Sequence, residues 1–129
     1  MNDMSQLVRS LDARNFIDPQ GFEVERAGLL ARTWQFACHV SQLENPGDYV
    51  AYELSDEQLF SIKGRDGVIR TFFNVCLHRA HQLLSGEGSA RVVVCPYHAW
   101  TYELTGRLRA APSSRSVPGF DAAQICLTA

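Results

Sequence analysis

The sequence predicts an all-β fold, a small antiparallel β-sandwich or barrel preceded by one N-terminal helix. From residue 34 onward, β-branched and aromatic residues alternate with polar ones in short runs, and residues typical of turns separate the runs. The chain has 129 residues, of which 46% are hydrophobic and 20% are charged. This length and composition favour one compact globular unit with a single core.

The leading helix is predicted from its start signal. Asp18 provides a side chain that can cap a helix, and Pro19 stands at the first helical position. Apolar residues then recur at three-to-four spacing as far as about Arg32. We therefore expect residues 1–33 to form an N-terminal extension and helix, and residues 34–129 to form the compact β domain.

Seven segments have the composition and the period-two alternation of strands. They are 34–40, 49–54, 58–63, 68–75, 91–94, 99–104 and a further short strand at 107–110. Turns are expected between them, at 45–47, 65–67, 86–88 and 105–106, where Gly, Pro, Asn or Asp gather.

Charge and hydropathy exclude two classes of partner. The net charge is −2, and no block of basic residues is present to bind nucleic acid or acidic lipid. The longest apolar stretches fall far short of the ~20 residues that span a bilayer. The N-terminus has no secretory signal pattern, so we expect a cytoplasmic protein with no nucleic-acid or membrane partner. In that compartment the four cysteines are thiols or metal ligands rather than disulfides.

Two short motifs carry the chemistry. Cys76-x-His78 is followed, after sixteen residues, by Cys95-x-x-His98. Each pair stands in the turn just after a predicted strand, so two neighbouring loops can bring the pairs together. Each loop then offers one thiolate and one imidazole, which predicts a metal site with mixed sulfur and nitrogen ligation.

Three occupants of such a site compete. A [2Fe–2S] cluster would take both cysteines on one iron and both histidines on the other. A zinc ion with two Cys and two His ligands is the second alternative, although zinc knuckles more often supply both cysteines from one loop. The third alternative is no metal, with the thiols buried in a core. The spacing favours the iron–sulfur cluster.

The residues around the motifs resemble a known family. Cys76-x-His78 with Cys95-Pro-Tyr-His98 is similar to the Rieske motif. The stretch from Cys95 to Tyr102, followed by 104–108, resembles the N-terminal Rieske domain of the large (α) subunit of ring-hydroxylating oxygenases, and the likeness covers about residues 18–121. Residues 81–88 are similar to the subgroup that acts on carnitine-like and betaine-like quaternary amines.

The resemblance implies a cofactor, partners and a role. It implies a Rieske-type antiparallel β-sandwich whose [2Fe–2S] cluster is held by Cys76, His78, Cys95 and His98. Electrons would come from a reductase or ferredoxin and pass to the mononuclear iron of a catalytic domain, in a parent enzyme that is a homotrimer. The alternative is a free-standing Rieske ferredoxin-like electron carrier.

The catalytic site of such an oxygenase is absent from this sequence. A mononuclear iron of this kind needs two histidines and one carboxylate. Once His78 and His98 are assigned, only His39 and His81 remain, with no acidic partner at useful spacing. This chain alone is therefore expected to relay electrons and to hydroxylate nothing.

Several positions differ from those of related proteins and bear on the loop conformation and the reduction potential. Ala80 and Ala99 replace the Gly that these enzymes often carry, which puts the need for a positive φ there in doubt. High-potential respiratory relatives usually have a serine where this chain has Trp100, and a disulfide where it has His81 and Tyr97. We therefore expect a reduction potential at the low end of the range from ~−150 to +300 mV.

Three residues outside the ligand set complete the expectations. Tyr102 is a candidate hydrogen-bond donor to a cysteine sulfur. Cys38 and Cys126 lie outside the motif spacing, and both are expected to be small buried residues.

Overall fold

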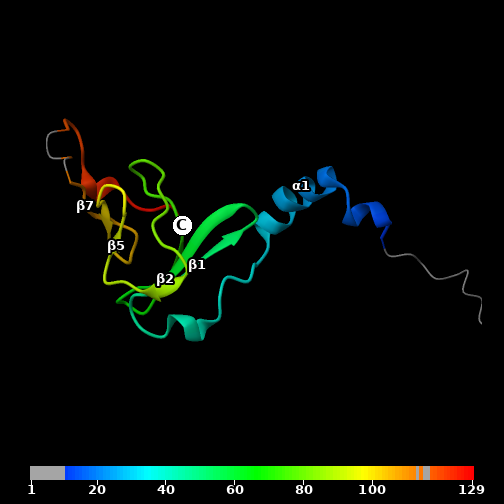
Figure 1. The fold of residues 1–129 in the computed structure, drawn as a ribbon, viewed down its shortest axis with the longest axis horizontal. Coiled ribbons are helices and arrows are strands. Elements are labelled where there is room, and N and C mark those ends of the chain that lie inside the picture. The colour runs from blue at the N-terminus through cyan, green and yellow to red at the C-terminus, as the bar shows by residue number, and fades with distance from the viewer. Residues whose placement is uncertain (1–10, 113, 115–116) are drawn as a thin grey trace, which may run out of the picture. The chain divides into compact units, whose positions relative to one another are not determined.

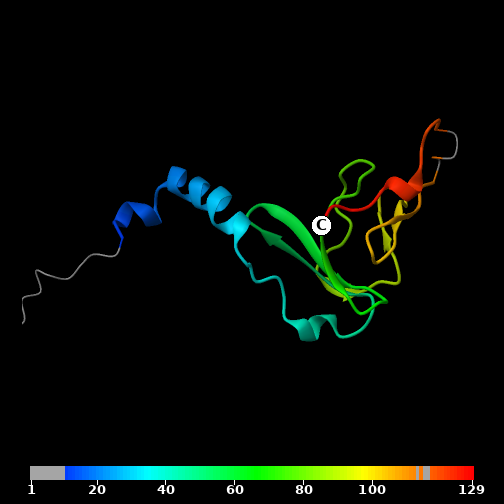
Figure 2. The same ribbon diagram turned by 180° about the vertical axis from the view of Figure 1, so that it is seen from behind.

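The computed structural model describes residues 11–112, 114 and 117–129. The chain divides into two compact units, and the boundary in the sequence falls after Phe36. The first unit contains helix α1 (Pro19–Gly28) between the short 3₁₀ helices η2 (Ala13–Phe16) and η3 (Leu30–Arg32). The second unit contains two antiparallel sheets (Figures 1 and 2). Within the described residues, no helix is long and apolar enough to cross a membrane.

Helix α1 begins where the sequence predicts it. The side chain of Asp18 accepts a hydrogen bond of 3.0 Å from the backbone N–H of Gln20, and Pro19 follows in the first turn. The helix ends at Gly28, before the expected end near residue 32, and the chain continues as η3. Glycine is a poor helix former, which accounts for the early end.

Four strands form the larger sheet, in the order β3-β2-β1-β4. They are β1 (Asp48–Leu54), β2 (Glu57–Lys63), β3 (Ile69–Phe73) and β4 (Glu87–Ser89). The smaller sheet has the order β5-β6-β7, with β5 (Val93–Val94), β6 (Thr101–Tyr102) and β7 (Leu108–Ala110). Two further 3₁₀ helices are η4 (Val40–Leu43) and η5 (Ala122–Gln124).

Most of the predicted strands are confirmed. Segments 49–54 and 58–63 match β1 and β2 to within one residue at each end, and 107–110 contains β7. Segments 68–75, 91–94 and 99–104 contain β3, β5 and β6, but each strand is shorter than its prediction. Of the residues left over, 74–75 lead into the first motif loop and 99–100 end the second.

The predicted strand at 34–40 is wrong. Residues 34–39 are irregular, Val40 begins η4, and Trp34 is fully exposed. Alternation alone does not make a strand, because a strand also needs a partner for its backbone groups. The edge of β1 is instead paired with β4, which the sequence predicted as a turn because of its glycines.

Glycine in β4 has a packing reason. A Cβ atom at Gly88 would lie 3.1 to 3.3 Å from atoms of the Tyr49 ring on the paired strand. A residue without a side chain therefore fits at this pairing, where sequence patterns indicate only a turn.

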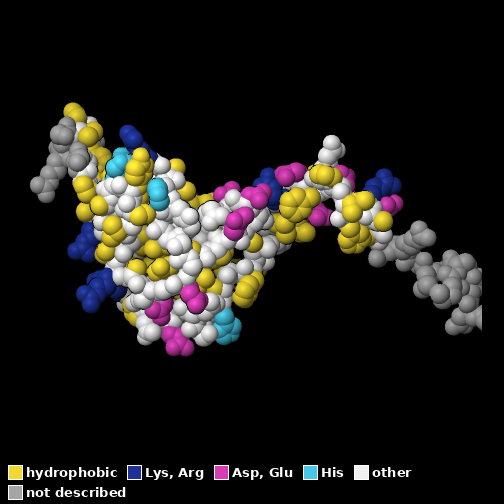
Figure 3. All heavy atoms as spheres, in the orientation of Figure 1, with side chains coloured by type: hydrophobic (Ala, Val, Ile, Leu, Met, Phe, Trp, Pro, Cys, Tyr) yellow, Lys and Arg dark blue, Asp and Glu magenta, His cyan; other side chains and the backbone are white. Residues whose placement is uncertain are grey.

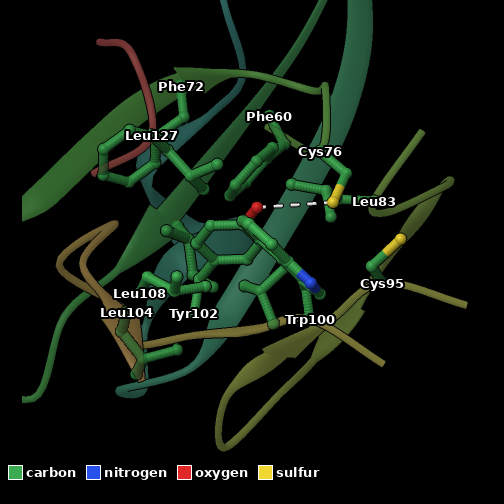
Figure 4. Close-up of a cluster of buried hydrophobic side chains, with 12 residues drawn as sticks. Phe60, Phe72, Cys76, Leu83, Cys95, Trp100, Tyr102, Leu104, Leu108 and Leu127 are labelled. Atoms are coloured by element: carbon green, nitrogen blue, oxygen red, sulfur yellow. Dashed lines mark hydrogen bonds between the residues drawn. The ribbon is translucent and has the colours of Figure 1, made fainter. Parts of the chain in front are cut away.

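One hydrophobic core joins the two sheets. It contains residues from both sheets, from the motif loops and from the end of the chain: Phe60, Ile62, Phe72, Cys76, Leu83, Val93, Cys95, Trp100, Tyr102, Leu104, Leu108 and Leu127 (Figure 4). The final segment is held by backbone hydrogen bonds from Phe73 N to Thr128 O (3.0 Å) and from Leu127 N to Gly106 O (2.9 Å). Both motif cysteines are thereby anchored in the core of this unit.

The two cysteines outside the motifs are less buried than expected. Cys126 is exposed, because it pairs with Arg107 in an isolated bridge that turns its neighbour Leu127 inward. Cys38 is partly exposed, and local desolvation raises the pKa of its thiol. The expectation of burial is therefore wrong for Cys126 and only partly met by Cys38.

Candidate metal centre

The first motif lies in a tight loop that follows β3. The backbone N–H of Cys76 donates to the carbonyl of His81 (2.8 Å), and the N–H of Ala80 donates back to the carbonyl of Cys76 (2.9 Å). An isolated bridge between Val75 and Gln82 closes the base of the loop. The loop is therefore fixed by its own backbone, with His78 at its outer end.

The second motif lies in a loop of the same construction between β5 and β6. The N–H of Cys95 donates to the carbonyl of Trp100 (2.8 Å), and the N–H of Ala99 donates to the carbonyl of Cys95 (3.0 Å). His98 stands in this loop as His78 does in the first. Each loop thus presents one thiol and one imidazole, as the spacing predicts.

Both loops retain a left-handed residue despite the absence of glycine. Ala80 has φ 53° and Ala99 has φ 56°. The sequence had left the need for positive φ in doubt at these two positions. The structure shows that the loop hydrogen bonds impose this conformation even on alanine, which adopts it at a cost.

The sulfur donors lie inside the protein and the nitrogen donors outside. Cys76 and Cys95 are buried, and their thiols are not in disulfides. His78 and His98 are exposed, and their ring centroids are 4.7 Å apart with the planes at 72°. In Figure 3 histidine side chains reach the surface over the part of the fold that carries β5 and β7. The structure therefore places all four sequence-predicted residues in two matched loops, with the thiols buried at the start of each loop and the imidazoles exposed further along it.

Tyr102 is confirmed as a hydrogen-bond partner of a motif cysteine. Its hydroxyl lies 3.3 Å from Cys76 Sγ and accepts a hydrogen bond of 3.1 Å from the N–H of Leu77 (Figure 4). Burial is the main cause that raises the pKa of Tyr102, and the hydrogen bond with Cys76 raises it further. The hydroxyl keeps its proton and, with Leu77 N–H as its donor, can direct that proton at the sulfur.

The surroundings of His98 favour its neutral form. Local desolvation lowers the pKa of the imidazole, and nearby positive charge at His78, Arg79 and His81 lowers it further. A neutral imidazole is the form that binds a metal ion.

Asn74 is a site residue that the sequence analysis missed. It is buried, and its side-chain oxygen accepts from the N–H groups of Leu83 (3.1 Å) and Leu84 (2.9 Å). Its amide nitrogen donates to the carbonyl of Leu84 (2.7 Å). Asn74 therefore ties the start of the first loop to the segment that returns from it. The available signal was its inward position in the alternation between buried Phe72 and Cys76.

The donor set fits a two-iron cluster. A [2Fe–2S] cluster takes its protein ligands in pairs, one pair on each iron. The paired imidazoles of His78 and His98 and the two free thiols match that division.

Comparison with known proteins identifies the family. Residues 33–121 match the family described as the Rieske [2Fe-2S] domain. The carnitine monooxygenase oxygenase subunit of Escherichia coli K12 is 45% identical over 87% of this chain, and the large oxygenase component of the naphthalene 1,2-dioxygenase system of Pseudomonas fluorescens is 35% identical over 85%.

Solved structures agree with these relatives. The quaternary ammonium Rieske monooxygenase CntA, in complex with L-carnitine, superposes with a TM-score of 0.85 at 40% identity, covering 89% of this chain and 33% of that one. Naphthalene 1,2-dioxygenase from Rhodococcus sp. gives a TM-score of 0.79 at 32% identity, covering 85% of this chain and 26% of that one.

The matches cover only part of each relative. This chain spans 30% of the length of the carnitine monooxygenase subunit and 25% of the naphthalene dioxygenase component. The fold, the mostly antiparallel sandwich with one helix, is that of Rieske oxygenases. The chain belongs to the Rieske [2Fe–2S] domain family, and its cofactor is a Rieske-type [2Fe–2S] cluster.

Proposed function

We propose that Cys76 and Cys95 bind one iron of the cluster and that His78 and His98 bind the other. The observation that carries this assignment is the matched pair of loops, each with a buried thiol and an exposed imidazole. Imidazole rings 4.7 Å apart can share one metal ion, and the match to the Rieske [2Fe-2S] domain family favours an iron of a cluster over a zinc ion as that metal.

The proposed role is electron transfer. A Rieske cluster takes up and releases one electron, and neutral imidazole ligands in place of two thiolates make that uptake easier. The buried cysteines hold the sulfur-ligated side within the core, while His78 and His98 stand at the surface. The histidines therefore give the electron its shortest route to and from a partner.

The reduction potential is expected to lie at the low end of the range from ~−150 to +300 mV. Tyr102 provides a hydrogen bond near Cys76, but Trp100 has no hydroxyl to provide another. A redox titration with a midpoint above about +100 mV would contradict this expectation.

We further propose that the chain serves an oxygenase. In this proposal a reductase or ferredoxin donates the electron, and the acceptor is a mononuclear iron in a catalytic domain outside this chain, in a cytoplasmic homotrimer. The partial coverage of oxygenase subunits supports this, because the match lies within the Rieske part of larger proteins. His39 caps η4 and His81 lies in the first motif loop, so neither belongs to a second iron site here.

The proposed substrate class is a quaternary amine. The carnitine monooxygenase subunit is 45% identical to this chain, against 35% for the naphthalene dioxygenase component. That difference supports the quaternary-amine subgroup over the aromatic one.

Iron and acid-labile sulfide analysis of the purified chain tests the ligand assignment. We expect two irons and two sulfides per chain, a red-brown colour, and loss of both in Cys76→Ser and Cys95→Ser. Cys126→Ser is the matched control, because Cys126 is exposed and outside both loops, and it should keep the full cluster. Colourless protein with stoichiometric zinc would overturn the assignment.

The coding sequence beyond residue 129 tests the oxygenase role. A continuation into a pattern such as Asp-x₂-His-x₄-His would supply a mononuclear iron site. The protein that contains it, with its reductase, should then oxidise L-carnitine or gamma-butyrobetaine in preference to naphthalene. A stop codon directly after Ala129 would instead favour the free-standing electron carrier.

A further inference from the structure

Each of the two motif loops places one aromatic ring against a ring of the other loop. His81 and Trp100 each provide the carbonyl that closes their own loop. The ring of His81 contacts Tyr97 of the second loop, at a centroid distance of 5.6 Å. The ring of Trp100 contacts His78 of the first loop, at 5.0 Å. Equivalent positions in the two loops therefore reach across to the opposite loop.

The two contacts differ in geometry and burial. Trp100 and His78 are stacked, with their planes only 7° apart, whereas His81 and Tyr97 are tilted by 42°. Trp100 is 9% exposed and belongs to the core, while Tyr97 is 53% exposed. The Trp100 stack is thus the flatter and more buried of the two contacts.

Trp100 is itself held in place. Its carbonyl accepts the N–H of Cys95, so the turn that places this cysteine also sets the backbone of Trp100. Its ring meets Phe120 edge-on, with centroids 5.8 Å apart and planes at 74°. The surface that Trp100 offers to His78 is therefore fixed by the core and by the second loop.

The His78 ring needs such support. The torsion that turns an imidazole about its Cβ–Cγ bond has a broad energy profile, so an exposed ring is not oriented by its own rotamer. His78 lies in contact with His98 at 4.7 Å and lies flat against Trp100. The flat contact is the one that defines the plane of the ring.

We propose that Trp100 is a positioning residue for His78: its indole fixes the plane of this imidazole from the opposite loop and shields one face of it from water. The inference rests on the proposed assignment of His78 as an iron ligand. Trp100 touches the imidazole, and it acts on the iron only through His78.

The chain provides a matched control. His81 occupies in the first loop the position that Trp100 occupies in the second, and its ring partner, Tyr97, is not a proposed ligand. Truncation of His81 removes a cross-loop ring contact and leaves the His78 stack in place. Any effect of loosening the loops in general should therefore appear in both variants.

The test is pulsed electron paramagnetic resonance of the reduced, cluster-loaded chain, with the histidine nitrogens observed directly. We expect Trp100→Leu to broaden the nitrogen hyperfine couplings, Trp100→Phe to restore narrow ones, and His81→Leu to match the unsubstituted chain. In the same samples, iron loss to bathophenanthroline disulfonate should accelerate about three- to tenfold in Trp100→Leu, the equivalent of one aromatic contact. Unchanged couplings in a fully loaded Trp100→Leu chain would overturn the inference.

A second variant tests the inference if Trp100→Leu does not take up the iron–sulfur cluster. Phe120→Leu keeps Trp100 but removes its edge-on aromatic neighbour, and it should broaden the couplings to an intermediate degree. Couplings like those of the unsubstituted chain in Phe120→Leu, together with broad couplings in Trp100→Phe, would overturn the stacking role. Absence of histidine couplings in the unsubstituted chain would instead refute the proposed ligand assignment.

Discussion

Ala80 and Ala99 adopt the same left-handed backbone conformation, at φ 53° and 56°, at matching places in the two motif loops. Each lies four residues after a motif cysteine, and each N–H donates to the carbonyl of that cysteine. The fold therefore accepts two strained alanines in order to keep both loops closed. L-residues rarely adopt this conformation because the side chain crowds the backbone.

Glycine at either position should stabilise the protein. Ala80→Gly and Ala99→Gly relieve the left-handed strain, against the added entropy of glycine in the unfolded chain, and we expect a net gain of up to about 1 kcal/mol each. Chemical denaturation of the chain measures the change. Ala110→Gly in β7 is the control and should destabilise by about 0.5–1 kcal/mol, because glycine weakens a strand. A loss of the same size in Ala80→Gly would refute the strain argument.

Tyr102→Phe should lower the reduction potential. The hydroxyl near Cys76 stabilises the additional negative charge of the reduced cluster, so its removal favours the oxidised form. A difference of about 1 kcal/mol between the two oxidation states corresponds to about 40 mV for one electron. Redox titration of both proteins measures it. Tyr52→Phe is the control, because the Tyr52 hydroxyl forms a hydrogen bond with Ser61 in the larger sheet. An equal shift of the reduction potential in Tyr52→Phe would refute the proposed role of the Tyr102 hydroxyl.

Asn74→Ala should destabilise the first motif loop. The substitution removes the acceptor of the buried Leu83 N–H and the part-buried Leu84 N–H, at an expected cost of about 2–3 kcal/mol. The carbonyl of Leu84 loses one donor but keeps the side-chain amide of Gln82. Asn45→Ala removes an exposed amide that bonds Asp48 and should cost far less. Unfolding curves compare the two, and equal losses would show that Asn74 has no special role.

The metal-free chain should lose stability as the pH falls below 6.5. The pKa of His98 is lowered from 6.5 in the folded protein, so the unfolded chain binds the proton first. The contribution of neutral His98 is therefore complete above pH 6.5 and decreases as the pH falls toward the lowered pKa. A ring titration by nuclear magnetic resonance should give a midpoint below 6.5 for His98. It should move upward in Arg79→Gln, and a midpoint at or above 6.5 would contradict the expectation.

The placement of the candidate ligands in two short loops was predictable from the sequence because the information for each loop is local. The turn that holds Cys76 and His78, and the one that holds Cys95 and His98, each close within a few residues. The same holds for the start of α1 at Asp18 and Pro19, where the capping side chain is next to the helix it caps. Short-range chemistry of this kind leaves a signature in spacing.

Features that depend on distant partners were not predictable in the same way. Segment 34–40 alternates like a strand, but the edge of β1 is occupied by β4, whose glycine fits against Tyr49. The stack of Trp100 on His78 likewise depends on how the two motif loops pack together, and the spacing of residues within each loop does not predict that packing. Sequence patterns indicate which structure a segment can adopt, and contacts with distant segments decide whether it adopts that structure.

Mössbauer spectroscopy of the iron-loaded chain is the most direct test of the central claim, that two thiolates hold one iron and two imidazoles hold the other. We predict two iron sites of equal intensity in the oxidised chain, with the added electron localised on the iron bound by His78 and His98 after reduction. Two equivalent sulfur-ligated irons, or a single type of iron in both oxidation states, would contradict the account.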